Sequence, residues 1–234
     1  MLFTPADLGA VSLAGRTVIV VDVLRATTTV ATALAAGAPA VYPVEGIEEA
    51  RRLAAELGGA VLGGERGGLP PEGFQRGNSP LEYQNGSDGQ PIVLTTTNGT
   101  RAIARAKEGS AGAIAAGALV NAKAVAAWAV GRGSDITVLC AGTHGRFSLD
   151  DVVAAGCIVD RASSEAAAGR LTLTDGALGA LMLWQRFREN PREGLLLAAH
   201  GQRLERLGFV DDLTYCASVD VLERVPVLQE ASMV

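Results

Sequence analysis

Three short segments of this chain combine glycine, hydroxyl, amide and charged side chains in an order that suits the binding of an anion. They read D-V-L-R-A-T-T-T from Asp22, T-T-T-N-G-T-R from Thr95 and C-A-G-T-H-G-R from Cys140. Each follows an apolar run typical of a buried strand and precedes a helical pattern. The first amides of a helix are unpaired and carry partial positive charge, so each segment predicts an anion site. Hydroxyl and guanidinium donors in these segments favour a phosphate group in particular.

Asp22 is the residue in these segments that could do chemistry on a phosphate group. A carboxylate at the end of a buried strand could attack phosphorus, hold Mg²⁺, or simply cap the next helix. Mg²⁺ prefers one or two carboxylates together with water and substrate phosphate, and Glu65, Asp150 or Asp151 could share that duty. Asp150 and Asp151 are adjacent and point about 100° apart on a helix, so we expect only one of them to face the site. Ser148 and Asp151 also have the spacing of a capping box.

Cys140 is a second candidate nucleophile, because Cys140 and Arg146 have the C-x5-R spacing of cysteine-dependent phosphatases. A helix N-terminus beside such a thiol can lower its pKa enough for the thiolate to attack phosphate. Short matches of this kind arise often by chance, and a buried, unreactive cysteine is the simpler interpretation. Cys157 and Cys216 lie in apolar or helical contexts, so we interpret both as structural.

The two histidines of the chain are candidates for proton transfer. His144 lies within the third segment, where it could bind substrate or donate a proton. His200 lies far along the chain in A-H-G-Q-R, and either histidine could instead serve only local hydrogen bonds.

Composition limits the class of protein. The chain has 234 residues, 48% of them hydrophobic and 19% charged, which suits one domain with a sizeable core. The net charge is −5 and no basic stripe is visible, which argues against nucleic acid as the main ligand. No run reaches the roughly 18–20 apolar residues of a membrane helix, and the first residues lack the features of a signal peptide. Three cysteines without a CxxC pair indicate no disulfide framework, so we expect a cytoplasmic protein.

Strands and helices alternate along the chain and must position the three segments. Apolar runs predict strands at about 16–23, 40–44, 60–62, 92–97, 112–116, 135–140 and 219–227. Helical periodicity predicts helices at about 26–36, 48–57, 101–107, 121–130 and 149–162. This order predicts one α/β domain over residues 1–234, with a mainly parallel sheet covered on both faces. Ligands bind beyond the carboxyl ends of parallel strands, so we expect the three segments to meet at one site. The long irregular loop at about 63–90 could close over a ligand there.

Taken together, these motifs resemble those of the 2-phosphosulfolactate phosphatase family of coenzyme M biosynthesis. The resemblance covers about residues 17–227, and its motifs are long and not generic. It rests on DVLRATTTV from Asp22, GER from Gly64, GF from Gly73, GNSP from Gly77, TTTNGT from Thr95, CAGTHGRFSLDDV from Cys140, and the stretch from His200-Gly201 through Asp212 and Asp220.

The resemblance implies a three-layer α/β/α fold, with a mainly parallel or mixed central sheet, and a Mg²⁺-dependent phosphatase. Such a phosphoric monoester hydrolase would convert (2R)-2-phospho-3-sulfolactate to 3-sulfolactate and phosphate. The expected catalytic residues are Asp22, Arg25, His144 and His200, and the expected metal ligands are Asp22, Glu65 and Asp151. The expected substrate-binding residues are Thr27, Thr28, Arg66, Asn98, Gly99, Thr100, Gly142, Gly145 and Arg146.

The substrate and the mechanism leave several alternatives open. The arginines in or beside the motifs are expected to hold the carboxylate and sulfonate groups; they are Arg25, Arg66, Arg76, Arg101 and Arg146. The enzyme could instead act on another 2-phospho-hydroxy acid, or use Cys140 and Arg146. It could also be a non-catalytic module that binds a phosphorylated metabolite. We expect a small phosphate-ester ligand and no nucleic-acid or membrane partner, while an aliphatic surface could form a homodimer.

Overall fold

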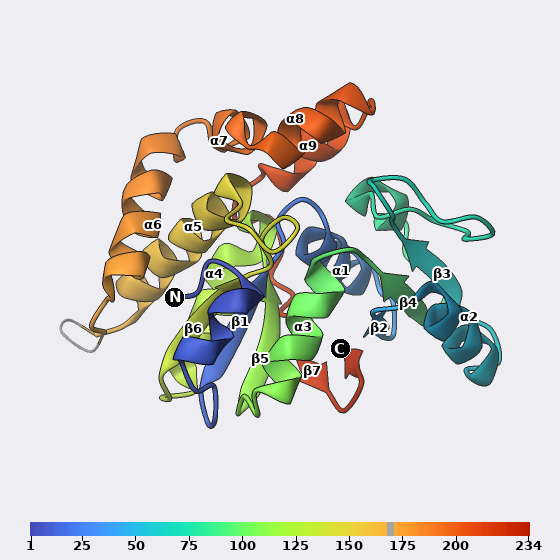
Figure 1. Ribbon diagram of the computed structural model, residues 1–234, viewed down its shortest axis with the longest axis horizontal. Helices are drawn as coiled ribbons and strands as arrows, with labels where there is room; N and C mark the ends of the chain where they lie inside the picture. The colour runs from blue at the N-terminus through green and yellow to red at the C-terminus, as the bar shows by residue number, and fades with distance from the viewer. Residues whose placement is uncertain (168–170) are drawn as a thin grey trace.

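Three parallel strands form the first sheet of the protein, in the order β5–β1–β6 (Figure 1). They are β1 (Thr17–Val21), β5 (Ala113–Gly117) and β6 (Ile136–Cys140). The computed structural model describes residues 1–167 and 171–234. Every residue of β1 is buried, because helices cover both faces of this sheet. The side chains of β1 alternate between two hydrophobic cores, as the period of a strand requires.

Two pairs of helices cover the two faces of the first sheet. The helices α4 (Ala122–Gly131) and α5 (Leu149–Glu165) pack on one face, and α1 (Ala26–Ala35) and α3 (Gly99–Glu108) pack on the other. A further helix, α6 (Asp175–Phe187), packs on α5. These layers confirm the α/β class and the α/β/α order around parallel strands.

A second sheet lies on the far side of α1 and α3, so the strands do not form one central sheet (Figure 1). Its order is β3–β4–β2–β8–β7, and the pairs β3–β4 and β2–β4 are parallel. The bounds are β2 (Val41–Val44), β3 (Val61–Gly64), β4 (Ile92–Thr95), β7 (Leu228–Gln229) and β8 (Ser232–Met233). The helix α2 (Ile47–Glu56) covers the outer face of this sheet through Ala50 and Ala54.

The C-terminal segment joins the two sheets. The backbone of Ala116 in β5 donates to Pro226, and Val227 pairs with Val234 at the end of the chain. Met233 in β8 then pairs with Val41 in β2. A strand over 219–227 was therefore the wrong prediction: that segment is irregular, and a short antiparallel hairpin follows it.

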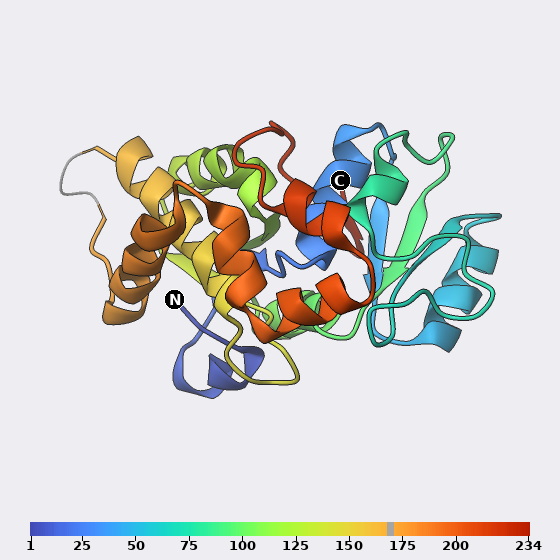
Figure 2. The ribbon, with the colours of Figure 1, turned by 90° about the horizontal axis from the view of Figure 1, so that it is seen from above.

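The remaining elements are short and mostly helical. They are η1 (Pro5–Ala10), η2 (Pro80–Tyr83), η3 (Leu119–Asn121), α7 (Pro191–Leu197), α8 (Ala199–Arg206) and α9 (Val210–Cys216). The helices α7, α8 and α9 run across one side of the molecule, as Figures 1 and 2 show together. Within the described ranges, no helix combines the length and the apolar content that a membrane span requires.

Candidate active site

The three polar segments meet at one pocket of about 490 Å³, as the sequence predicted. The first segment contributes Asp22, the second Thr97 and Asn98, and the third Thr143 and His144. The loop after β3 and the helix α8 complete the lining. Other lining residues are Leu24, Arg25, Glu65, Arg66, Gly67, Gly68, Asn78, Ala199, His200, Arg203 and Arg206.

The turn between β1 and α1 is braced by its own threonines. Thr27 Oγ1 donates to the carbonyl of Asp22 at 2.9 Å and accepts from the Asp22 amide at 3.1 Å. Thr28 Oγ1 donates to the carbonyl of Val23 at 2.8 Å. Both threonine side chains are fully buried and do not line the pocket. Their place in the structure is therefore to hold the turn that presents Asp22, rather than to face the cavity.

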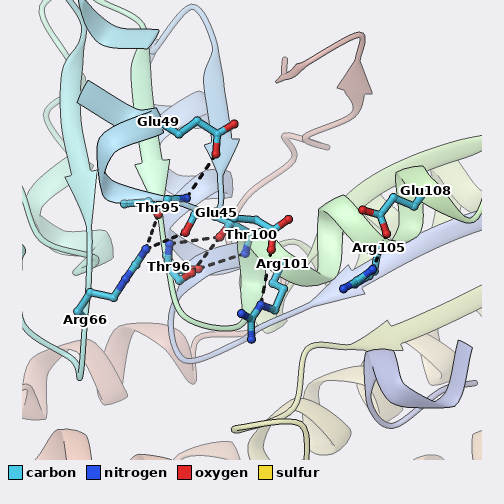
Figure 3. Close-up of polar contacts among 10 residues, drawn as sticks. Glu45, Glu49, Arg66, Thr95, Thr96, Thr100, Arg101, Arg105 and Glu108 are labelled. Carbon is cyan, nitrogen blue, oxygen red and sulfur yellow. Dashed lines mark hydrogen bonds and ion pairs between the residues drawn. The ribbon is translucent and has the colours of Figure 1, made fainter. Parts of the chain in front are cut away.

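The helix α3 begins directly beside the Asp22 carboxylate. A Cβ atom on Gly99 would lie 2.7 Å from Asp22 Oδ2 and 2.5 Å from the Ala26 Cβ, so only glycine permits this approach. Thr96 and Thr100 fix the start of the helix, since each hydroxyl accepts from the other residue's amide (Figure 3). Thr100 is buried away from the pocket, whereas Asn98 lines it.

The carboxyl group of Asp22 is buried without a cationic partner among the described residues. Its pKa is raised to about 7, mainly by burial and also by the nearby carboxylates of Asp150 and Glu65. A hydrogen bond from the Ala26 amide and the charge of Arg25 oppose this rise in the pKa. Acidic groups thus crowd together at Asp22, an arrangement that a bound cation would stabilise.

The two neighbouring aspartates of α5 have different surroundings. Asp151 Oδ1 accepts from the Val23 amide at 3.0 Å, and its Oδ2 accepts from the Gly142 amide at 2.9 Å. Asp151 therefore ties the first segment to the third and makes no capping box with Ser148, contrary to the predicted spacing. Asp150 accepts from the Ser148 hydroxyl, and burial raises its pKa, while the charge of His200 lowers it.

Glu65 fixes the loop that follows β3. Its Oε2 accepts from the Gly68 amide at 2.7 Å, and its Oε1 accepts from the Thr97 amide at 2.8 Å. Burial raises the pKa of Glu65, but these hydrogen bonds and the charge of His200 outweigh it and hold the pKa below its ordinary value. Glu65 is therefore a stable anion that links the loop to the second segment.

Arg66 lines the pocket, but its guanidinium group is engaged by the protein. It donates to the carbonyls of Glu65 at 2.7 Å and Glu45 at 2.8 Å, and to Thr95 Oγ1 at 2.9 Å. Figure 3 shows the side chain turned toward Thr95, with Arg101 directed at Glu45. Arg101 does not line the pocket.

Arg25 forms a buried ion pair that joins three parts of the chain. Its Nη1 lies 2.6 Å from Asp212 Oδ2 in α9, and its Nη2 donates to the Gly68 carbonyl at 2.8 Å. Ser79 Oγ donates to the other oxygen of Asp212, and the guanidinium stacks on the ring of Phe209. Arg25 lines the pocket, yet its contacts are those of a residue that positions the loop after β3.

The third segment forms a tight hairpin, in which Thr143 and Arg146 exchange two backbone hydrogen bonds. Gly142 has φ +67°, and a Cβ there would lie 2.4 Å from the Arg146 carbonyl oxygen, so glycine is required. His144 is exposed at the pocket, and its amide donates to Asn98 Oδ1 at 3.3 Å. Gly142, Gly145 and Arg146 do not line the pocket.

Cys140 lies at the end of β6 and is fully buried. Burial raises the pKa of its thiol well above the ordinary value, and the carboxylates of Asp151 and Asp150 raise it further. A thiol in these surroundings is neutral and inaccessible, which is opposite to a nucleophilic cysteine. The C-x5-R spacing therefore does not correspond to a phosphatase loop in this structure.

The helix α8 brings three titratable side chains to the pocket: His200, Arg203 and Arg206. The sequence predicted a role for His200 but missed the two arginines. The spacing of three residues between them was the available signal, because it places them on one side of a helix. Of the five arginines expected to hold substrate, only Arg25 and Arg66 line the pocket.

Asn78 is a further residue that the sequence did not single out for binding. It lines the pocket, only 4% of its surface is exposed, and its Oδ1 has no hydrogen-bond partner. An unpaired buried acceptor costs about 1–3 kcal/mol. A cation, or water held by a cation, would satisfy this oxygen.

Comparison with known proteins places this α/β chain among the phosphoric monoester hydrolases. Residues 2–231 match the family model described as 2-phosphosulpholactate phosphatase. The chain belongs to this family.

Relatives of similar length carry the same name. A protein of Carboxydothermus hydrogenoformans named "Probable 2-phosphosulfolactate phosphatase" is 46% identical over 222 residues, which are 94% of this chain and 90% of that protein. Proteins of the same name from Symbiobacterium thermophilum and Thermotoga maritima are 42% and 43% identical. The match to the Symbiobacterium protein covers 96% of each chain. The match to the Thermotoga protein covers 91% of this chain and 89% of that protein.

Proposed function

We propose that this protein hydrolyses (2R)-2-phospho-3-sulfolactate to 3-sulfolactate and inorganic phosphate, with Mg²⁺ as its cofactor. The observation that carries the proposal is the buried Asp22 carboxylate beside the start of α3, in a pocket that also holds basic side chains. The names of the relatives, which are probable 2-phosphosulfolactate phosphatases, support this choice of substrate.

The oxygen atoms around Asp22 fit the requirements of Mg²⁺. This ion takes one or two carboxylates and keeps water and substrate phosphate as its other ligands. No group of three or more His, Cys, Asp or Glu side chains in the described ranges is arranged to hold a metal by itself. Asp22 and the unpaired oxygen of Asn78 line the pocket, and Asp150, which does not line it, lies near enough to Asp22 to raise its pKa. Together they would supply a smaller set of oxygen ligands for Mg²⁺.

We expect Asp22 and Asp150 to hold the ion. Asp151 and Glu65, the other two ligands expected from the resemblance, each use both carboxylate oxygens to accept backbone amides. When bound, Mg²⁺ would neutralise charge on the transferring phosphoryl group.

The chain's own groups would bind the phosphate and move the proton. The start of α3 lies beside Asp22, and the amides of its first turn other than that of Thr100, which bonds to Thr96, would donate to phosphate oxygens. In the hydrolysis, a new oxygen–phosphorus bond forms and the bond from phosphorus to the C2 oxygen of the substrate breaks. The departing alkoxide needs a proton, which His200 is placed to donate because it lines the same pocket.

The nucleophile that attacks phosphorus could be either Asp22 or water. If Asp22 attacks, an aspartyl phosphate forms, which water then hydrolyses. If water attacks directly, Asp22 only binds the metal. Reduction of the enzyme with borohydride during turnover separates them, because an aspartyl phosphate at Asp22 is converted to homoserine and free Asp22 is not.

A panel of phosphate esters tests the proposed substrate. Phosphate release is measured with Mg²⁺ from racemic 2-phosphosulfolactate, 2-phospholactate and 2-phosphoglycerate. The proposal expects 2-phosphosulfolactate to have the highest kcat/KM. A clear preference for another ester would assign another 2-phospho-hydroxy acid. Tight binding of every ester without turnover would instead support a metabolite-binding module.

A further inference from the structure

The pocket has two electrostatic parts that come from different elements. The carboxylates of Asp22 and Glu65 come from the β1–α1 turn and from the loop after β3. The basic side chains of Arg203 and Arg206 come from α8 and reach the same cavity. A phosphate ester held at Asp22 therefore has a second, cationic region within the same 490 Å³.

The basic region is built into one side of α8. At about 100° per residue, Ala199, His200, Arg203 and Arg206 fall within an arc of roughly 120°, and all four line the pocket. Leu204 lies fully buried on another side of the helix. Glu205 lies on the far side from the arc and does not line the pocket, so it does not neutralise these arginines there.

The two arginines differ in their engagement with the protein. Arg203 Nη2 donates to the Gly67 carbonyl at 3.0 Å, which ties α8 to the loop after β3. Arg206 makes no ion pair or side-chain hydrogen bond with any residue in the described ranges. Its guanidinium group is thus available to a ligand in the pocket.

We propose that Arg206, with Arg203 beside it, binds the sulfonate group of the substrate and so sets the preference for a phosphate ester with a distal strong anion. This inference rests on the proposed function. Guanidinium groups suit an anion with several equivalent oxygens, because their N–H donors form paired, charge-assisted hydrogen bonds. Neither Arg66 nor Arg25 can take this role without giving up its bonds to the protein.

A comparison of two substrates separates this role from a general effect of charge. The substrates are 2-phosphosulfolactate and 2-phospholactate, which lacks the sulfonate group. Arg206→Gln should raise KM for 2-phosphosulfolactate about tenfold, the usual effect of losing about 1.4 kcal/mol of binding, with kcat nearly unchanged. The KM for 2-phospholactate should stay within about twofold of the wild-type value, and Arg206→Lys should be intermediate.

The matched control is Arg188→Gln, which removes the same charge from an exposed arginine at the end of α6. It should leave both KM values unchanged. Equal increases in KM for the two substrates in Arg206→Gln, or no increase, would overturn the inference.

Binding measured by calorimetry tests the role of Arg206 independently of the proposed phosphatase activity. If the wild type does not turn over 2-phosphosulfolactate, the proposed function fails, but binding of 3-sulfolactate and lactate can still be measured. The inference expects wild type to bind 3-sulfolactate more tightly than lactate, and Arg206→Gln to lose that difference. A difference that is absent in wild type, or that survives the substitution, would overturn the inference.

Discussion

Asp22 is the single residue on which the proposed chemistry depends most. Asp22→Asn keeps the shape of the side chain but removes the charge that would hold Mg²⁺ or attack phosphorus. We expect kcat to fall by about 10²–10³, the usual cost of removing one central electrostatic group. The fold should be retained, because burial raises the pKa of this carboxyl and so disfavours its charged form. Phosphate release and thermal unfolding, measured on the same preparation, check both statements. A folded variant with near-normal kcat would contradict the role.

Residue types alone predicted much of the site but not the direction of each side chain. Asp22, Glu65, Asn98, His144 and His200 line the pocket as expected. Thr27, Thr28 and Thr100 were expected to touch substrate, yet each bonds the backbone of its own turn. Threonine and glycine are typical both of a helix start and of a phosphate site, so only the fold shows which of the two roles each residue has.

The start of α3 is the element that most directly shapes the site. Gly99→Ala would place a methyl group 2.7 Å from Asp22 Oδ2. The helix or the carboxylate must then shift, and a misplacement near 1 Å can cost about 10² in rate. We expect a fall in kcat and a loss of about 1–3 kcal/mol in stability. Steady-state kinetics and denaturant unfolding measure these effects.

Gly179→Ala is the matched control for this substitution. Gly179 lies within α6, and a Cβ there would meet nothing within 4 Å. This variant should keep full activity and gain about 0.5–1 kcal/mol, because alanine favours a helix interior. Loss of activity in both variants, or in neither, would contradict the stated role of Gly99.

The Arg25–Asp212 pair connects α9, the start of α1 and the loop after β3. Both side chains are almost fully buried, so Asp212→Ala would leave an unpaired guanidinium group in the interior. We expect a loss of about 3–5 kcal/mol in the free energy of unfolding. The neighbouring exposed Asp211→Ala should lie within about 0.5 kcal/mol of wild type. Chemical denaturation compares them, and equal stabilities would contradict the account.

The sequence predicted which segments form helices and strands, but not which of these elements pack against one another. The alternation of β-branched runs and helical periods gave β1, α1, β6 and α5 close to their observed bounds. Nothing local in these runs states that α1 and α3 lie between two sheets. The place of α8 beside the pocket also depends on contacts between distant parts of the chain, which is why Arg203 and Arg206 were missed.

The buried acidic groups affect the stability of the whole molecule. Asp22 has an ordinary pKa near 3.9 when unfolded and about 7 in the folded protein without metal. A raised pKa means that its stabilising contribution is complete below about pH 4 and is lost as the pH rises toward 7. We therefore expect the Tm of metal-free protein to fall between about pH 4 and 7, and Mg²⁺ to raise Tm more at pH 8 than at pH 6.

Thermal unfolding across this pH range, in EDTA and in Mg²⁺, measures the effect. Asp22→Asn is the control, since it removes the titrating group and should flatten both the pH dependence and the response to Mg²⁺. A Tm that changes with pH in the same way in wild type and Asp22→Asn would show that other groups are responsible.

The activity proposed for the whole molecule is metal-dependent hydrolysis at the Asp22 pocket. The most direct measurement is phosphate release from racemic 2-phosphosulfolactate by wild-type protein, first with Mg²⁺, then with excess EDTA, then with Mg²⁺ restored. The account predicts release with Mg²⁺, its loss in EDTA and its recovery afterwards. Release that continues unchanged in EDTA would contradict the claim, as would its absence in Mg²⁺ from protein shown to be folded.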